Sequence, residues 1–277
     1  MTLSRREVRE LLARHQIKPS RARGQNFVVD PNTVRRVARL AGVGPGDRVV
    51  EVGAGLGSLT LALAETGAPV LAVEVDRRLV SVLREVVEER PGVTVVEADA
   101  MALDWPGLLG AGPWVLVANL PYNIGTPLVA DLLDDVPAIE RMLVMVQREV
   151  GERLVAGPGA DAYGGLSVKV AYWATGRLVG RVPPTVFYPP PAVDSVLVSL
   201  ERRRFPAIGP DVEPAWLFAL VGAGFRHRRK MLRRALEGLV TAEDFAAAGI
   251  RPEARAEELD VEAWGRLARC ASPPTPS

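Results

Sequence analysis

Residues 48–60 read Arg-Val-Val-Glu-Val-Gly-Ala-Gly-Leu-Gly-Ser-Leu-Thr, a pattern that predicts a strand, a glycine-rich turn and the start of a helix. Glycines in such a turn let the backbone pass close to a ligand. The dinucleotide-binding fingerprint requires Gly-x-Gly-x-x-Gly, but here Gly53, Gly55 and Gly57 alternate and Ser58 stands where the last glycine should be. The turn indicates a nucleoside-type cofactor, with an ordinary strand-to-helix turn as the alternative. Its spacing disfavours a nicotinamide dehydrogenase.

The chain around this turn alternates between strand and helix patterns. Apolar runs that we interpret as further strands lie at residues 70–76, 93–99, 114–117 and 141–147, and helical patterns separate them. Such alternation predicts an α/β fold, a parallel sheet with helices on both faces. Ligands bind beyond the carboxyl ends of the strands in these sheets. Gly53, Glu74, Asp99 and Asn119 are all expected at that edge.

Acidic residues at two strand ends suit the two halves of a nucleoside. Glu74 lies where a carboxylate can accept hydrogen bonds from both hydroxyls of a ribose. Asp99, at the tip of the next strand, could accept from an adenine amino group. The alternative reading, a solvated charge or a helix cap, fits Asp76 better than Glu74.

Residues 117–127, Val-Ala-Asn-Leu-Pro-Tyr-Asn-Ile-Gly-Thr-Pro, bring a polar side chain, an exposed carbonyl and an aromatic ring together at a strand end. Adenine N6 is a poor nucleophile because its lone pair is delocalised into the ring. The Asn119 side-chain oxygen and the Leu120 carbonyl can accept its two N–H groups and stabilise the positive charge that develops during attack on a methyl donor. Pro121 limits backbone freedom, and Tyr122 can stack on the base. The alternative is a strand end followed by a proline turn.

A proline-rich segment at residues 183–194 predicts a stiff loop between two closing strands. This loop could present Phe187 as a second stacking face for a base. Phe187 could equally pack the loop against the protein, and the sequence leaves both possibilities open.

The composition is that of an ordinary globular protein, with 277 residues, 48% of them hydrophobic and 24% charged. No apolar run reaches the length of a membrane span, and the charged N-terminus has no signal-peptide core. Cys270 is the only cysteine, and His15 and His227 are the only histidines. We therefore expect a soluble cytoplasmic protein with no disulfide framework, no metal site and no membrane partner.

The net charge is only +1, but basic residues gather in two patches that could bind phosphate. The first is an N-terminal arm. The second is at residues 224–234, most of it in a helix predicted at residues 228–239, with a solvated helix face as the alternative. The arm contains Arg5, Arg6, Arg9, Arg14, Lys18, Arg21 and Arg23, and the candidate phosphate contacts of the second patch are Arg226, Arg228, Arg229, Lys230 and Arg233.

Residues 201–214, with charge, proline and glycine, have the composition of a linker. The pattern after them is helical only. We predict two domains, residues 1–203 with the sheet and the basic arm, and residues 204–277 as a small all-helical domain that contacts nucleic acid.

These features together resemble the rRNA adenine N6,N6-dimethyltransferase family, and within it the small-subunit (16S) rRNA branch. The likeness runs from residue 24 to the region of residues 257–262. The motifs that carry it are Gly24-Gln-Asn-Phe, the glycine-rich turn at 51–60, Asn119-Leu-Pro-Tyr-Asn, Gln147-Arg-Glu-Val, Phe187-Tyr-Pro-Pro-Pro-Ala-Val-Asp-Ser and Arg228-Arg-Lys-Met-Leu.

The resemblance implies a Rossmann-like class I methyltransferase sheet with S-adenosylmethionine as methyl donor. The implied partner is 16S rRNA, within the small ribosomal subunit or its precursor, and the implied targets are two adjacent adenosines near its 3′ end. It assigns Gln25, Asn26 and Val28 to the methionine side of the cofactor, Gly53 and Gly55 to the glycine loop, Glu74 to the ribose, Asp99 and Ala100 to the adenine, and Asn119, Leu120, Pro121, Tyr122 and Phe187 to the target base.

Two departures from the family pattern concern the loop and the basic patch. Gly125 stands where serine is usual, and Arg234 where asparagine is common. Two other functions stay open at this point. One is methylation of large-subunit 23S rRNA, and the other is RNA-binding assembly of the ribosome with incidental methylation.

Overall fold

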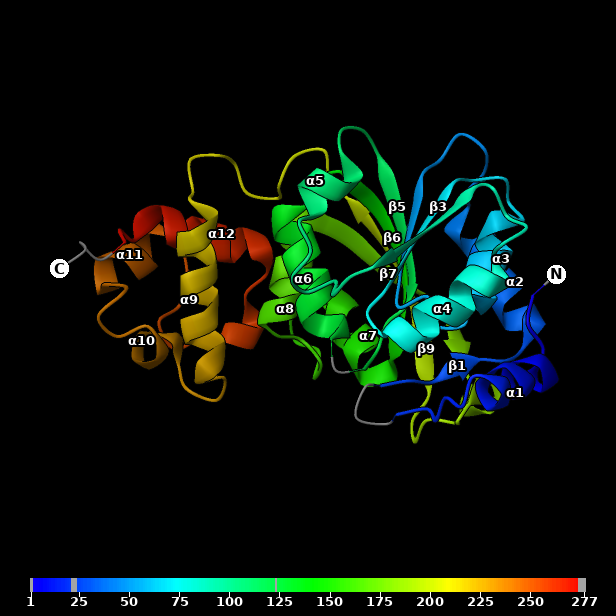
Figure 1. Ribbon diagram of the computed structural model, residues 1–277. Coiled ribbons are helices and arrows are strands. Elements are labelled where there is room, and N and C mark those ends of the chain that lie inside the picture. Colours follow the sequence, from blue (N-terminus) through cyan, green and yellow to red (C-terminus); the bar gives the residue numbers. More distant parts are fainter. Residues whose placement is uncertain (1, 21–23, 123, 274–277) are drawn as a thin grey trace. The chain divides into compact units, whose positions relative to one another are not determined.

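The computed structural model describes residues 2–20, 24–122 and 124–273, so Arg21, Arg23 and Asn123 lie outside the described residues. The chain forms two compact units, Met1–Gly151 with Arg177–Arg202, and Glu152–Gly176 with Arg203–Ser277 (Figure 1). The later junction lies between Arg202 and Arg203, and the boundary expected from the sequence pattern follows residue 203. Residues 152–176, which the sequence pattern groups with the first domain, instead belong with the C-terminal helices. The reason is that their apolar side chains are buried in the core of the second unit, namely Tyr163, Val168 and Tyr172.

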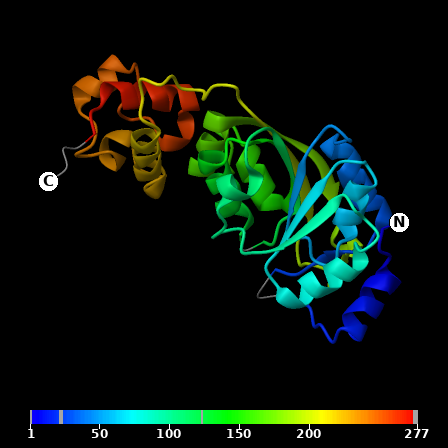
Figure 2. The ribbon, with the colours of Figure 1, turned by 45° about the horizontal axis from the view of Figure 1, so that its top comes forward.

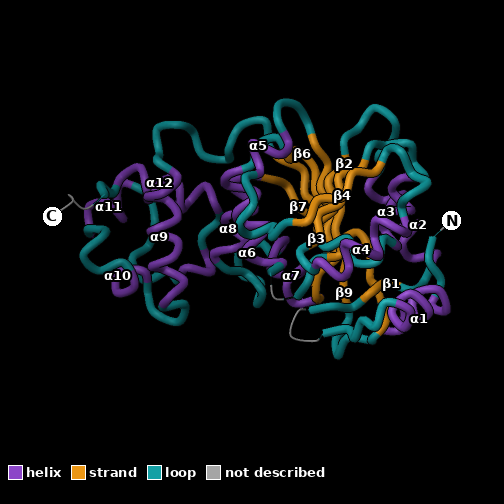
Figure 3. Tube along the Cα trace, viewed as in Figure 1, coloured by secondary structure: helices purple, strands orange, loops and turns teal. Residues whose placement is uncertain are grey.

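A seven-stranded sheet forms the centre of the first unit (Figure 3). Its strands in chain order are β2 (Val49–Val52), β3 (Val70–Glu74), β4 (Val93–Glu97), β5 (Trp114–Asn119), β6 (Ile139–Gln147), β7 (Ala174–Val182) and β9 (Ser195–Arg202). They lie in the order β4-β3-β2-β5-β6-β9-β7. Strands β2 to β6 are parallel to their neighbours, and β9 is antiparallel to β6. The strand order reverses between β2 and β5, which makes this the switch point where such sheets bind ligands.

Helices cover both faces of this sheet, as predicted. Helices α2 and α3 lie on one side and α6 on the other (Figure 1, Figure 2). The helices of this part of the chain are α1 (Arg5–Arg14), α2 (Pro31–Ala41), α3 (Ser58–Ala64), α4 (Arg77–Val86), α5 (Trp105–Leu109), α6 (Gly125–Asp135) and α7 (Arg148–Val155). The α/β fold predicted from the sequence, a mainly parallel sheet with helices on both faces, is confirmed.

Local sequence sets the ends of the helices that flank the site. Helix α2 is capped at its N-terminus by Asp30, whose carboxylate accepts the Thr33 N–H, and at its C-terminus by Gly42 in the left-handed conformation. Helix α4 is capped at its N-terminus by Asp76, whose carboxylate accepts the Arg78 N–H. Asp76 thus has the helix-cap role that its position in the sequence favoured.

A small two-stranded sheet joins the N-terminal segment to the proline-rich loop. Strand β1 (Phe27–Val28) pairs antiparallel with β8 (Phe187–Tyr188), which follows the 3-10 helix η2 (Pro184–Val186). The apolar face of α1 packs into a buried cluster with Phe27 and Leu56. This packing holds the N-terminal segment beside the glycine-rich turn.

The second unit is all-helical, as predicted. Its apolar core centres on Trp264, Leu217 and Leu220, which are fully buried. No helix in the described ranges has both the length and the apolar character needed to cross a membrane. The elements are α8 (Gly165–Trp173), α9 (Pro214–Arg226), α10 (Leu232–Ala235), α11 (Ala242–Ala247), η3 (Ala256–Glu258) and α12 (Val261–Cys270).

The helix predicted at residues 228–239, which carries most of the basic patch, is wrong in its extent, because only Leu232–Ala235 are helical. Helix α9 ends at Arg226, residues 227–230 form a turn, and α10 has only four residues. The backbone N–H groups of Leu232 and Arg233 donate to the carbonyls of Ala254 and Pro252, 2.8 and 3.0 Å away. These bonds tie the segment to a distant part of the chain, which local periodicity cannot reveal.

Candidate functional site

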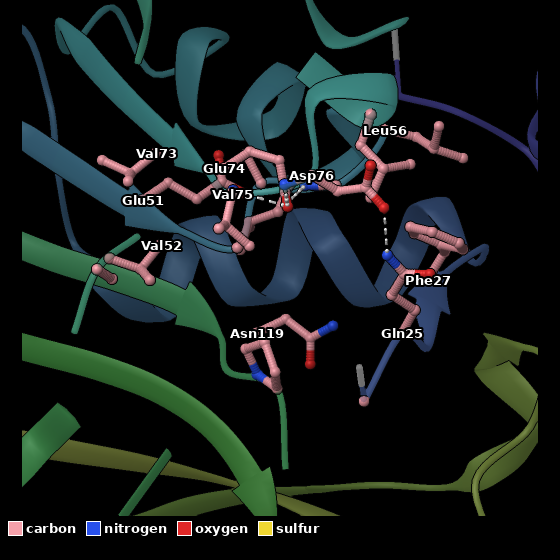
Figure 4. Close-up of a pocket in the computed structure, with 18 of the residues that line it drawn as sticks. Gln25, Phe27, Glu51, Val52, Leu56, Val73, Glu74, Val75, Asp76 and Asn119 are labelled. Atoms are coloured by element: carbon pink, nitrogen blue, oxygen red, sulfur yellow. Dashed lines mark hydrogen bonds between the residues drawn. The ribbon is translucent and has the colours of Figure 1, made fainter. Parts of the chain in front are cut away.

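A cavity of about 260 Å³ lies at the carboxyl ends of β2, β3 and β5, at the switch point of the sheet (Figure 4). Its wall includes every residue that the sequence pattern and the resemblance assigned to a cofactor. These are Gln25, Asn26, Val28, Gly53, Gly55, Glu74, Asp99, Ala100 and Asn119. Pro121 also lines the cavity, whereas Leu120, Tyr122 and Phe187 are not part of its wall.

The glycine-rich turn needs its glycines for conformation and for space. Gly53 and Gly55 have φ angles of +72° and +60°, which side chains with a Cβ rarely adopt. A Cβ on Gly53 would lie 3.3 Å from the Pro121 ring, and one on Gly55 would lie 3.2 Å from the Phe27 ring. The turn is therefore packed directly against the segment that follows β5 and against the N-terminal segment.

Glu74 is held by backbone N–H groups at the edge of the cavity. Its Oε2 accepts from Gly55, and its Oε1 accepts from Val75 and Asp76, each at 2.9 Å. Burial raises the pKa of this carboxyl, while the three backbone hydrogen bonds act in the opposite direction. Each carboxylate oxygen has two lone pairs, so one acceptor position, on Oε2, is left. A ribose held through both hydroxyls must therefore share or displace one of these backbone bonds.

Glu51 is a site residue that the sequence reasoning missed. It lines the cavity, its side chain is 1% exposed, and the Thr60 hydroxyl donates to its Oε2 at 2.6 Å. Burial raises the pKa of Glu51 to about 8, and the neighbouring charge of Glu74 acts in the same direction. The cavity thus contains a carboxyl that is mostly protonated at neutral pH. The sequence did contain a signal for this residue, because Glu51 is an acidic residue in the middle of an apolar strand pattern.

Apolar side chains of the cavity were also missed. Val75 lines it with 62% of its surface exposed, directly after Glu74. Phe27 and Leu56 add apolar surface from the N-terminal segment and the turn (Figure 4). An exposed aliphatic residue next to an acid at a strand end provides a flat apolar contact beside a hydrogen-bond acceptor, a combination suited to a nucleoside.

The N-terminal segment is tied across the cavity by Gln25 and Asn26. The Gln25 amide donates to Asp76 Oδ2 at 3.2 Å, and its oxygen accepts the Ser20 N–H at 2.8 Å. The backbone carbonyl of Asn26 accepts from Asn119 Nδ2 at 3.1 Å. That last bond uses the donor side of the Asn119 amide, so its Oδ1 is the atom left to accept from a ligand.

The segment after Asn119 is fixed by its backbone. The Leu120 N–H donates to the Met145 carbonyl, and the Pro121 carbonyl accepts from Ile124 and Gly125, each at 3.1 Å. Within the described ranges, nothing donates to Asn119 Oδ1 or to the Leu120 carbonyl. A Cβ on Gly125 would lie 3.5 Å from its nearest neighbours, an ordinary van der Waals contact. A serine side chain would therefore fit at its Cβ, and lack of room does not explain the glycine at this position.

The two aromatic residues assigned to the target base lie in different environments. Tyr122 is half-buried, its hydroxyl lies 2.9 Å from Ser195 Oγ, and burial raises its pKa. Phe187 is fully buried in an apolar cluster with Val28 and Leu197. The structure therefore favours the packing alternative for Phe187, because none of its ring is exposed to a base.

Comparison with known proteins identifies the family. The profile of the family described as ribosomal RNA adenine dimethylase matches residues 16–272. The chain belongs to this family. The ribosomal RNA small subunit methyltransferase A from Cutibacterium acnes is 49% identical to this chain, over 95% of this chain and 91% of its own length. The protein of the same name from Streptomyces coelicolor is 47% identical, over 95% of this chain and 94% of its own length.

Solved structures of similar proteins also cover most of the chain. The 23S rRNA methyltransferase ErmE is 28% identical with a TM-score of 0.69, covering 88% of this chain and 99% of its own. A dimethyladenosine transferase from Plasmodium falciparum has a TM-score of 0.74 at 23% identity, covering 87% of this chain and 95% of its own. The second likeness bears on the fold alone.

The five candidate phosphate contacts of the second basic patch fall into two groups. Arg228 pairs with Glu257 at 2.7 Å and donates to the Asp161 carbonyl, and Arg233 lies 3.4 Å from Glu253. The other three candidates are Arg226, Arg229 and Lys230, and all three are exposed. Among the described residues, none forms an ion pair or a hydrogen bond with their side chains. Across the described ranges, no cluster of three or more histidine, cysteine or acidic side chains could hold a metal.

Proposed function

We propose that the protein transfers methyl groups from S-adenosylmethionine to N6 of two adjacent adenosines near the 3′ end of 16S rRNA, twice per base. The observation that carries this proposal is the cavity at the switch point, whose wall combines Glu74 and Asp99 with the Asn119 amide; the Leu120 carbonyl is the next acceptor along the chain. The expected site of action is the small ribosomal subunit or its precursor in the cytoplasm.

The choice of small-subunit rRNA follows from the relatives. The curated relatives at 42–49% identity are called small subunit methyltransferases, whereas the large-subunit enzyme ErmE is 28% identical. The higher identity extends over nearly the whole chain, including the helical unit. Both observations favour 16S over 23S rRNA as the substrate.

The residues of the cavity fit the proposed cofactor. Asp99 is exposed and its Oδ1 accepts the Met101 N–H at 2.9 Å, which leaves Oδ2 for an adenine amino group. Glu74 offers its remaining lone pair to the ribose, and Val75 lies beside it as an apolar surface for the adenine ring. The methionine end would lie near Gln25, Asn26 and Val28.

S-adenosylmethionine, when bound, supplies a methyl group on a positive sulfonium, which is already a good leaving group. The chain's own residues then need chiefly to position the amine. Asn119 Oδ1 and the Leu120 carbonyl accept its two N–H groups and stabilise the positive charge that grows on N6. Tyr122 stacks on the base once the nucleotide has left its helix. The proton lost from N6 passes to water.

Transfer of labelled methyl groups to undermethylated small subunits, followed by mapping of the modified bases, tests this function. We expect two adjacent dimethylated adenosines near the 3′ end of 16S rRNA. Purified large subunits lacking adenine methylation are the comparison substrate. Preferential labelling of the large subunit would overturn the choice of 16S rRNA, and no labelling of either would overturn the methyltransferase function.

The grouping of basic residues predicts separable effects on RNA binding. Replacing Arg226, Arg229 or Lys230 with glutamine should each reduce the slope of binding against salt concentration by about 1, because one phosphate contact is lost. Arg228→Gln should instead lower thermal stability, because it breaks the pair with Glu257. Binding to small-subunit rRNA at several salt concentrations, together with thermal unfolding, measures both. Equal salt slopes for all four variants would contradict the grouping.

A further inference from the structure

Ser195 is a fully buried polar residue at the start of β9, opposite Gln147 of β6. Its hydroxyl lies 2.9 Å from the Tyr122 hydroxyl, and this is the bond that satisfies it. A buried hydroxyl without a hydrogen-bond partner costs free energy. The buried Ser195 hydroxyl and the half-buried Tyr122 hydroxyl are therefore both stabilised by this bond. The bond joins two segments 73 residues apart in the chain.

Tyr122 is thereby held at both ends of its side chain. The backbone just before Tyr122 is fixed by the hydrogen bonds of the Leu120 N–H and the Pro121 carbonyl. The phenol end is held by Ser195. Without that bond, the half-buried ring could change its angle about the Cα–Cβ bond. Ser195 therefore determines the plane that Tyr122 presents.

We propose that Ser195 is a positioning residue that, through Tyr122, sustains the second methyl transfer to each adenine. The inference rests on the proposed dimethylation. In each transfer the N6 lone pair forms a bond to the methyl carbon, the S–C bond breaks with its electron pair going to sulfur, and one N6 proton is released to water. The sulfonium becomes a neutral thioether.

The second transfer depends more on the ring than the first. An unmethylated amine has two N–H groups for its two acceptors, Asn119 Oδ1 and the Leu120 carbonyl. A monomethylated amine has one N–H, so one acceptor bond is lost. Stacking on Tyr122 then contributes more to the orientation of the monomethylated adenine. Loss of the hydrogen bond between Ser195 and Tyr122 should therefore slow the second transfer more than the first.

The test compares Ser195→Ala, Tyr122→Phe and the double variant on undermethylated small subunits. The digested rRNA is analysed for N6-methyl- and N6,N6-dimethyladenosine over time. We expect each single variant to slow the second transfer about ten-fold more than the first, the effect of one hydrogen bond, so that monomethyladenosine accumulates. The double variant should be no worse than either single one, because both remove the same bond.

Controls separate positioning from stability. Ser199→Ala, on the same strand, should leave the ratio of products unchanged, and Ser195→Thr, which keeps the hydroxyl, should restore dimethylation. A purely structural role of Ser195 would slow both transfers equally. If Ser195→Ala does not fold, Tyr122→Phe at the half-buried ring decides alone. An unchanged product ratio in Tyr122→Phe would overturn the inference, whereas absence of dimethyladenosine with the unmodified protein would overturn the proposed function instead.

Discussion

Asn119→Ala should lower methyl transfer by about 100- to 1000-fold, the loss typical of removing one preorganised group that stabilises charge in a transition state. Its Oδ1 is oriented by the bond from Nδ2 to the Asn26 carbonyl, 3.1 Å long, and nothing else in the described ranges binds that oxygen. Alanine removes the acceptor without filling the cavity. Single-turnover transfer to small subunits at saturating cofactor measures the effect.

Binding of RNA should survive this substitution, because Asn119 lies at the cofactor cavity and not among the exposed basic residues. Asn32→Ala, at an exposed position on α2, is the matched control and should retain full transfer. Asn119→Asp keeps an acceptor oxygen but faces the Asn26 carbonyl with a second acceptor, so it should recover little activity. Unchanged turnover in Asn119→Ala would refute the role of the amide oxygen.

Glu51→Gln should stabilise the protein at alkaline pH and make its stability less dependent on pH. The folded protein raises the pKa of Glu51 from 4.5 to about 8 because the carboxyl is buried. Its contribution to stability is therefore complete below pH 4.5 and is lost as the pH rises from 4.5 through about 8, because in that range the unfolded chain ionises this carboxyl while the folded protein keeps it protonated. The loss amounts to at most roughly 1.4 kcal/mol per pH unit.

Glutamine has the same shape and can still accept from the Thr60 hydroxyl, but it does not ionise. Thermal unfolding of both proteins between about pH 5 and pH 9 provides the measurement, and the gap should widen with pH. Glu97→Gln, at an exposed position on β4, is the matched control for a change from glutamate to glutamine outside the cavity. A constant difference across this range would mean that Glu51 is not protonated in the folded protein.

Local patterns in the sequence were sufficient for most of the fold. Apolar runs interrupted by helical periodicity predict the parallel sheet, and the ends of its strands locate the cavity, because parallel strands end at a common edge. The pattern alone places Gly53, Glu74, Asp99 and Asn119 at that edge, and the structure brings them together. The cap at Asp76 was also predictable, since capping depends only on neighbouring residues.

Contacts between distant residues decided the rest. The sequence by itself determined the α/β architecture, the glycine turn and the set of polar strand ends. Only the tertiary structure decided that Phe187 is buried, that Arg228 is paired with Glu257, that the basic patch is divided between the end of α9, a turn and α10, and that Ser195 anchors Tyr122. The physical reason is that a strand or cap forms from interactions within a few residues. The environment of a side chain depends on whichever segments the fold packs against it.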